Sequence, residues 1–396
     1  MTSPCEPLDL HVSRPSVYLD QWVWIRLARA ASGEPREPAD TSVLRAVQDA
    51  SSAGVAFPLS VTHYMETAKV TDPRQRATLA RTMALISRCR TLRNSGDLLR
   101  HQFLHAMYLS FSRPAFRPTA PEALGVGVWW AFNGKEAHFS LFDKSSGEKT
   151  DPASIPGMQK FMRLANQFAE FQMFAGPRDD EIEELRSNGY RPEAAVEATR
   201  SRLEWEEIYV GLLADDPISR HELRVRVQVR ELLHEHSKLF NELLAEYRLD
   251  LHREVNYNPD RPNVSREGMV AFADRIPSLR IAVDLKIELF RNASKTWTVN
   301  ALHDIDAMSM AVPYCHVVVP DKEMASLMAR SKAGERNGTQ VLRQMQQLPD
   351  VLSALTTRAR EIGGDASGWA WAGPGEGFCI DESEVHSAAL NQPCAE

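Results

Sequence analysis

The stretch that decides the fold is Asp304-Ile-Asp-Ala-Met-Ser-Met-Ala-Val-Pro-Tyr-Cys-His-Val-Val-Val-Pro-Asp321. Its three consecutive valines, residues 317–319, are β-branched and apolar, which predicts a short buried strand. Residues 304–312, before the valines, have the small and apolar spacing of a short helix. A helix that leads into a buried strand ending in an acid is typical of an α/β protein with a parallel sheet.

The N-terminal part of the chain repeats this pattern. Residues 16–20, Ser-Val-Tyr-Leu-Asp, predict a buried strand that ends at an acid. Helical spacing follows over 21–31 and 41–53, and a second short strand is predicted at 55–57. Ser60 is a suitable N-cap for a helix that runs to about residue 69. This strand-helix-helix-strand-helix order again favours a parallel sheet.

The middle of the chain is different in character, because helical patterns dominate it. After residue 298 the α/β pattern returns, with a helix over 321–330 and a last helix from Pro349 to about 361. Between them, residues 339–342 are compatible with a strand or with a helix. We therefore predict an α/β domain interrupted by a large, mainly α-helical insertion. The expected parts are 15–72 and 298–362 for the two halves of the domain, 73–297 for the insertion and 363–396 for a disordered tail. Within the insertion we expect helices at 74–91, 95–111, 157–175, 191–213, 219–247 and 276–291, a weak strand at 137–142 and a loop at 248–265.

Composition excludes several classes of protein. The chain has 396 residues and a net charge of −7, so a nucleic acid would have to bind on a local patch rather than over the whole surface. Its five cysteines form no CxxC pair, which argues against a zinc ribbon or a disulfide framework. No apolar run is long enough to span a membrane, and the N-terminus lacks the pattern of a signal peptide. We expect a cytoplasmic protein that does not bind membranes.

Acids recur where parallel strands should end. Asp20 closes the first predicted strand and Asp321 follows the valine strand, while Glu66, Asp304 and Asp306 lie on neighbouring predicted helices. Ligands of open parallel sheets bind at the carboxyl ends of the strands. Crowded carboxylates suit Mg²⁺ or Mn²⁺, and such an ion can promote hydrolysis of a phosphodiester. Each acid taken alone also has an ordinary explanation as a turn, N-cap or surface residue.

These segments resemble the PIN-like domain family of metal-dependent nucleases. Val17-Tyr-Leu-Asp-Gln-Trp-Val-Trp-Ile25 is similar to the opening strand and first acid of the family. Pro58-Leu-Ser-Val-Thr-His-Tyr-Met-Glu66 is similar to its second motif, and the 304–321 stretch to its late segment. The resemblance covers about 15–70 and 298–360 and implies a PIN-like parallel sheet flanked by helices.

The resemblance also implies roles for individual residues. Asp20, Glu66, Asp306 and Asp321 would be the catalytic acids and would bind Mg²⁺ or Mn²⁺, with Asp304 as a further metal ligand. Asp306 fits the family better than Asp304, because it directly precedes Ala307. Ser60 or Thr62 would hold a water or an acid beside them. The sequence departs from the family pattern at Trp22, His316 and Pro320.

The most basic stretch of the chain follows the Glu66 helix. Arginine suits phosphate through its fixed fork of donors, so this stretch is a candidate nucleic-acid surface, although a solvated helix face explains it as well. The candidate residues are Arg74, Arg76, Arg81, Arg88, Arg90 and Arg93.

The function we expect is hydrolysis of RNA by a metal-activated water. RNA is preferred to DNA on the resemblance alone. The alternative is a catalytically degenerate PIN-like scaffold that acts as an RNA- or protein-binding module. Because nucleases of this kind are often held by an inhibitor, an inhibitory protein partner is a further expectation from the resemblance.

Overall fold

The two ends of the described chain meet in one small parallel sheet. In the computed structural model, β1 (Val17–Leu19) pairs in parallel with β6 (Val317–Val319), and β6 pairs in parallel with β7 (Gln340–Val341). The register places Val17 opposite Val317. The predicted parallel sheet is confirmed, and the protein is a mostly helical α/β protein with this three-stranded sheet among many helices. The structure describes residues 14–135, 140–177, 180–189, 191, 193–215, 218–254, 262–292 and 296–363, so the predicted tail lies almost wholly outside them.

The strand predicted at 55–57 is reduced to a single bridge. Ser16 bridges Ala56 in parallel, and the backbone then continues to a second parallel bridge between Leu59 and Thr91. Pro58 between the two bridges has no N–H group to donate, which interrupts the ladder. Beyond it, β2 (Arg90–Leu92) pairs antiparallel with β3 (Leu124–Val126). Neither β2 nor β3 was predicted from the sequence.

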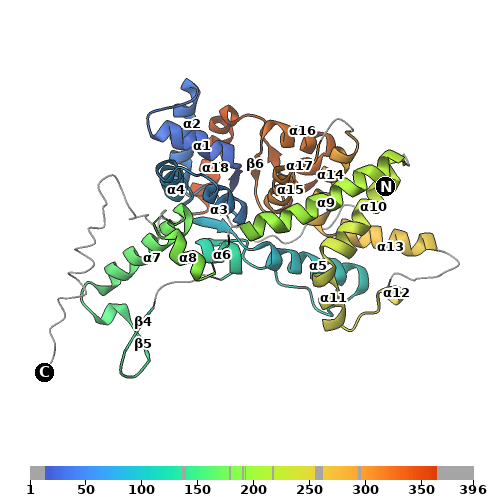
Figure 1. Cartoon of the computed structure of the whole chain (residues 1–396), viewed down its shortest axis with the longest axis horizontal. Helices are drawn as coiled ribbons and strands as arrows, with labels where there is room; N and C mark the ends of the chain where they lie inside the picture. Colours follow the sequence, from blue (N-terminus) through green and yellow to red (C-terminus); the bar gives the residue numbers. More distant parts are fainter. Residues whose placement is uncertain are drawn as a thin grey trace.

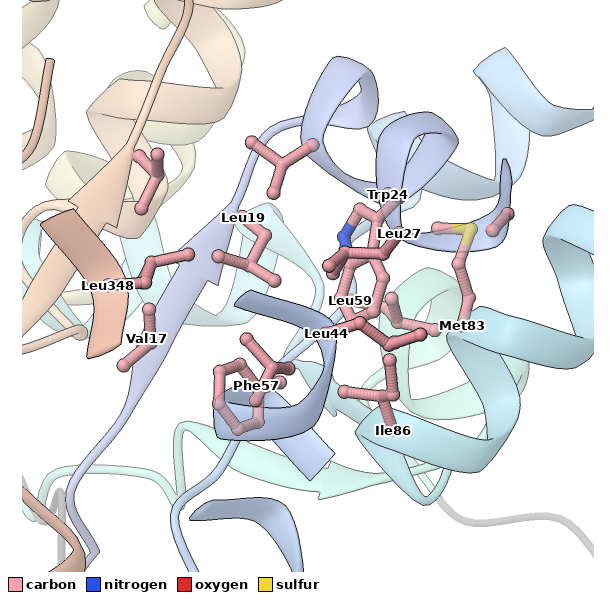
Figure 2. Packing of buried hydrophobic residues seen from close by; sticks show 14 of the residues in the cluster. Val17, Leu19, Trp24, Leu27, Leu44, Phe57, Leu59, Met83, Ile86 and Leu348 are labelled. Carbon is pink, nitrogen blue, oxygen red and sulfur yellow. The ribbon is translucent and has the colours of Figure 1, made fainter. Parts of the chain in front are cut away.

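Alternation along the strands divides the interior into two cores. Val17 and Leu19 face a core that includes Trp24 and Phe57 (Figure 2), whereas Tyr18 faces a second core. Successive side chains of a strand point to opposite faces, so one short strand supplies both cores. The first core is covered by α1 (Gln21–Ala31), α2 (Pro38–Ser52), α3 (Val61–Ala68), α4 (Pro73–Ser87) and α18 (Leu348–Glu361). The second is built with α14 (Pro277–Phe290), α15 (Val299–Ala311), α16 (Lys322–Ser331) and α17 (Ala333–Asn337), on the other side of β6 (Figure 1).

The first and last helices of the predicted insertion belong to these two cores. Leu79 and Met83 of α4 lie in the first core, and Ile281 and Leu285 of α14 lie in the second. Helices on both sides of the boundaries expected near 73 and 297 therefore share the same cores. A third core, with Phe103, forms between α14 and helices of the middle of the chain. The elements between α4 and α14, besides β2 and β3, are α5 (Ser95–Phe111), α6 (Val128–Asn133), β4 (Leu141–Phe142), β5 (Lys149–Thr150), the 3-10 helix η1 (Pro152–Ser154), α7 (Met158–Ala175), α8 (Ile182–Ser187), α9 (Glu193–Asp215), α10 (Arg220–Arg230), the π-helix η2 (Glu231–Glu235), α11 (Ser237–Glu246), α12 (Leu251–Glu254) and α13 (Pro262–Asp274).

Two predictions for the middle of the chain were wrong in detail. The single helix expected over 219–247 is divided into α10, η2 and α11. Part of the loop expected over 248–265 is helical, because α12 lies within it and α13 begins at Pro262. In the part of the chain that the structure describes, no helix is long and apolar enough to cross a membrane.

Candidate metal centre

Asp20 and Asp321 lie at the carboxyl ends of the adjacent strands β1 and β6. Each caps the helix that follows: one carboxylate oxygen of Asp20 accepts the N–H of Gln21, and one of Asp321 accepts the N–H of Met324, both at 2.6 Å. The Asp20 N–H donates to the Val319 carbonyl at 3.2 Å, which ties the two strand ends together. Capping therefore uses one oxygen of each carboxylate, and the backbone N–H of Asp321 also lowers the pKa of Asp20. A carboxylate can accept further bonds from a ligand in addition to these.

Glu66 and Asp304 join these two acids from α3 and α15. Burial raises the pKa of Asp20 to about 6, with a further contribution from Asp321. Burial, followed by the charge of Asp20, raises the pKa of Glu66 to about 7. The pKa of Asp304 rises to about 8 through burial and then through the charges of Asp20, Asp321 and Glu66. Four carboxylates from four elements therefore lie within electrostatic reach of one another.

A polar cavity of about 170 Å³ connects two of these acids. Asp304 and Asp321 both line it, together with Glu323 and the hydroxyl-bearing residues Thr296 and Thr298. The cavity gives a small ligand access to carboxylates from two different elements.

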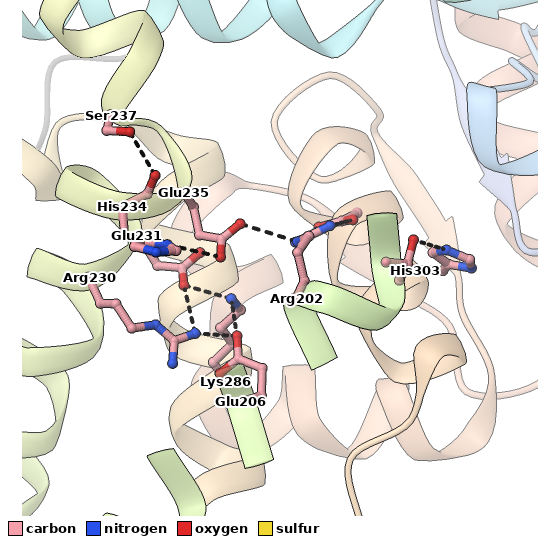
Figure 3. Close-up of polar contacts among 11 residues, drawn as sticks. Arg202, Glu206, Arg230, Glu231, His234, Glu235, Ser237, Lys286 and His303 are labelled. Atoms are coloured by element: carbon pink, nitrogen blue, oxygen red, sulfur yellow. Dashed lines mark hydrogen bonds and ion pairs between the residues drawn. The ribbon is translucent and has the colours of Figure 1, made fainter. Parts of the chain in front are cut away.

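Asp306, which the resemblance favours over Asp304, lies elsewhere. Its two carboxylate oxygens accept hydrogen bonds from Arg202 at 2.7 and 3.0 Å, and Arg202 also pairs with Glu235 at 3.2 Å (Figure 3). Residues two apart on a helix point about 200° apart, so Asp304 and Asp306 cannot both face the strand ends. The structure brings Asp304, and not Asp306, to the other acids.

The predicted supporting residues have different surroundings. The Ser60 hydroxyl lies 2.9 Å from the Tyr18 hydroxyl, and Ser60 caps α3. Thr62 makes no side-chain hydrogen bond within the described residues. His63, which the sequence analysis missed, is buried: its Nδ1 accepts the Ser60 N–H at 2.9 Å and its Nε2 donates to the Leu19 carbonyl at 2.7 Å. Burial lowers the pKa of His63 to about 4, so the neutral ring fixes the end of β1 against α3.

The basic stretch is used partly inside the fold. Arg76 is buried and donates to the carbonyls of Val70 and Pro177 at 2.8 Å each. Arg93 pairs with Asp97 at 2.8 Å. The guanidinium of Arg76 is therefore occupied inside the fold, and one edge of the Arg93 guanidinium is held by Asp97. Of the other members, Arg74 and Arg81 lie on α4, Arg88 caps its C-terminal end, and Arg90 begins β2.

The acids fit a hydrated divalent cation better than a dehydrated one. Among the described residues, no three His, Cys, Asp or Glu side chains are arranged as a ready-made metal site. Mg²⁺ does not need one, since it keeps several waters and binds through one or two carboxylates. The donor set here consists of hard oxygens only, which suits Mg²⁺ or Mn²⁺ rather than Zn²⁺.

Comparison with known proteins shows no relative. No protein-family model, curated protein or solved structure matches the chain. The resemblance to PIN-like domains therefore stays an expectation from the sequence motifs quoted above.

The raised pKa values predict an unusual pH dependence of stability. Between pH 6.5 and 8.5 in EDTA, folded Glu66 and Asp304 lose protons that the unfolded chain has already lost, so the free energy of unfolding should fall as pH rises. Below about pH 6.5 the buried histidines oppose this trend, which is why the window starts there. Urea denaturation across the window measures the slope. Asp304→Asn should flatten this slope. An unchanged slope would show that the neighbouring acids do not raise the pKa of Asp304.

Proposed function

We propose that the protein is a metal-dependent phosphodiesterase, and specifically a PIN-like ribonuclease. The observation that supports this most strongly is the gathering of Asp20, Glu66, Asp304 and Asp321 at the carboxyl edge of a parallel sheet. Partly buried like charges cost stability, and here no basic side chain forms an ion pair with any of the four among the described residues. Such a cost is expected where the charges serve a ligand.

The chain's own groups suggest a division of labour. Asp20 and Asp321 are held in place by their capping bonds, so they are suited to bind Mg²⁺ or Mn²⁺ with Asp304 or Glu66. When bound, the ion would lower the pKa of a water and neutralise charge on a phosphate. Asp304 and Glu66 have raised pKa values, which makes them better proton acceptors than ordinary carboxylates. They would orient the attacking water and take its proton.

The choice of RNA comes from the resemblance. The parallel order β1-β6-β7, extended at β1 by the Ala56 bridge, is compatible with a PIN-like sheet. The second candidate function is a degenerate scaffold that binds RNA or protein. The absence of a ready-made metal site among the described residues favours that alternative.

Asp304 and Asp306 provide a matched pair of variants for testing the proposal. Asp304→Asn should reduce Mn²⁺-dependent cleavage of RNA by about 10²-fold or more, the loss typical of removing a charge-stabilising group. Asp306→Asn removes the same charge two residues away, from the ion pair with Arg202, and should stay within about threefold of wild type because it leaves the acids intact. The readout is the rate of cleavage of a labelled single-stranded RNA, with and without Mn²⁺.

Each pattern of loss has a distinct meaning. Loss in Asp306→Asn alone would support the residue assignment from the resemblance and contradict the geometric one. If wild type cleaves neither RNA nor a small phosphodiester with Mn²⁺, the nuclease proposal fails in favour of the binding scaffold.

A further inference from the structure

A larger cavity runs along α16 from the acids. It has a volume of about 490 Å³, and its polar lining includes Asp321, Lys322, Ser326, Arg330 and Asn292. Four residues also line the smaller cavity that contains Asp304: Leu289, Asp321, Glu323 and Leu327. We call the larger cavity the α16 groove. It is continuous with the candidate metal centre.

The groove contains the acids Asp321 and Glu323. Three of its other polar residues are evenly spaced along one face of α16. Lys322, Ser326 and Arg330 are each four residues apart, so all three lie on the same side of α16. Eight residues of helix correspond to a rise of about 12 Å, which spans more than one phosphate of an extended strand. The track begins one residue after Asp321, at the carboxyl edge of the sheet. A strand that follows it is therefore led towards the acids.

The two cations of the track are available to a ligand. Lys322 is exposed and forms no ion pair within the described residues. The Nε of Arg330 donates to Glu288 at 3.1 Å, while the Arg330 side chain is 50% exposed. Glu288 is only 4% exposed and also pairs with Arg220 at 2.6 Å, so it is firmly placed. This contact holds one edge of the guanidinium, and the remaining N–H donors of Arg330 can bind phosphate.

We propose that the α16 groove binds the phosphodiester backbone of a single nucleic-acid strand, through Lys322 and Arg330, beside the phosphate to be cleaved. This inference rests on the proposed function, and it replaces the predicted basic stretch after Glu66 as the nucleic-acid surface. A narrow track of cations suits a protein whose overall charge is −7, because only a local patch can offset the repulsion of a polyanion. The backbone contacts are shared by RNA and DNA, and RNA is the ligand expected from the proposed activity.

The test measures binding separately from cleavage. Asp20→Asn serves as the background, so that the labelled strand stays intact, and binding of single-stranded RNA is measured by fluorescence anisotropy in Mg²⁺ at several salt concentrations. Loss of two phosphate contacts in Lys322→Gln/Arg330→Gln should reduce the slope of log K against log salt by about 1.4. The matched control is Arg29→Gln/Arg45→Gln, which removes the same charge from exposed positions on α1 and α2. A thermal melt of each variant verifies folding.

The possible outcomes separate this inference from the proposed function. A reduced slope in the α16 variant, with the control unchanged, supports the groove. Equal slopes in the two variants, or no RNA binding by the background protein, overturn the groove. Hydrolysis of bis(p-nitrophenyl) phosphate by wild type with Mn²⁺ would still support the nuclease chemistry in that case. A parallel series with DNA of the same sequence shows whether the ribose 2′-hydroxyl contributes.

Discussion

Asp20→Asn should abolish Mn²⁺-dependent phosphodiester hydrolysis, with a loss of about 10²-fold or more, while the fold is retained. The asparagine side-chain oxygen can still accept the Gln21 N–H, so the cap of α1 survives. The substitution removes a charge that raises the pKa values of Glu66 and Asp304. The variant should therefore melt no lower than wild type at pH 8 in EDTA. Initial rates on RNA, paired with melting curves, measure both effects.

The control for this variant is Asp72→Asn. Asp72 is also a helix N-cap, since it accepts the N–H groups of Arg74 and Gln75 at the start of α4, but it is exposed and does not contribute to the raised pKa of any of the clustered acids. Its activity should equal that of wild type. If Asp20→Asn keeps wild-type activity, or loses no more activity than Asp72→Asn does, then Asp20 acts only as a helix cap.

Lys286→Met should cause the largest loss of stability, about 3–5 kcal/mol in the free energy of unfolding. Lys286 on α14 is 1% exposed, and its Nζ donates to Glu206 at 2.7 Å and to Glu231 at 2.6 Å (Figure 3). Burial alone would lower the pKa of Lys286, but the two carboxylates raise it, so the ammonium stays charged. Methionine fills a similar volume and removes the ammonium that both buried carboxylates share. Arg230 remains beside both of them, hydrogen-bonded to Glu206 and 3.6 Å from Glu231. Denaturation by urea, followed by circular dichroism, measures the loss.

Two further variants show whether the loss comes from the unpaired charges. Lys286→Met combined with Glu206→Gln and Glu231→Gln should recover part of the stability, because the uncompensated charges are gone. Arg186→Met breaks an exposed pair with Glu193 and should cost less than about 1 kcal/mol. A cost for Lys286→Met as small as that of Arg186→Met would contradict the buried network.

Local sequence signals predicted β6 and β1, because an unbroken run of β-branched residues such as Val317–Val319 is typical of a strand that is buried on both faces. Strand-end acids followed from the same pattern, so Asp20 and Asp321 were found. The choice between Asp304 and Asp306 could not be made this way. It depends on the rotation of α15 about its axis, which is set partly by Arg202, a residue distant in the sequence.

Contacts between residues that are far apart in the sequence could not be predicted either. The helix over 276–291 was predicted, yet nothing in its spacing indicated that Lys286 would be buried, because its partners come from α9 and from the π-helix η2. The strands β2 and β3 are as short as β1 and β6, but Arg90-Thr-Leu92 and Leu124-Gly-Val126 lack a run of large apolar or β-branched residues that would indicate a strand. The surroundings of the basic stretch after Glu66 could not be predicted for a related reason: Arg76 donates to the distant Pro177 carbonyl, whereas Arg93 pairs with the nearby Asp97.

The most direct test of the metal centre is a melting curve of wild type and of Asp20→Asn/Asp321→Asn, each with EDTA and with millimolar Mn²⁺ at pH 8. A cation that binds only the folded state raises the melting temperature. We predict a clear upward shift for wild type and none for the double variant, in which both caps persist but two of the clustered charges are gone. An equal shift in both proteins, or no shift in either, would contradict a metal held between these acids.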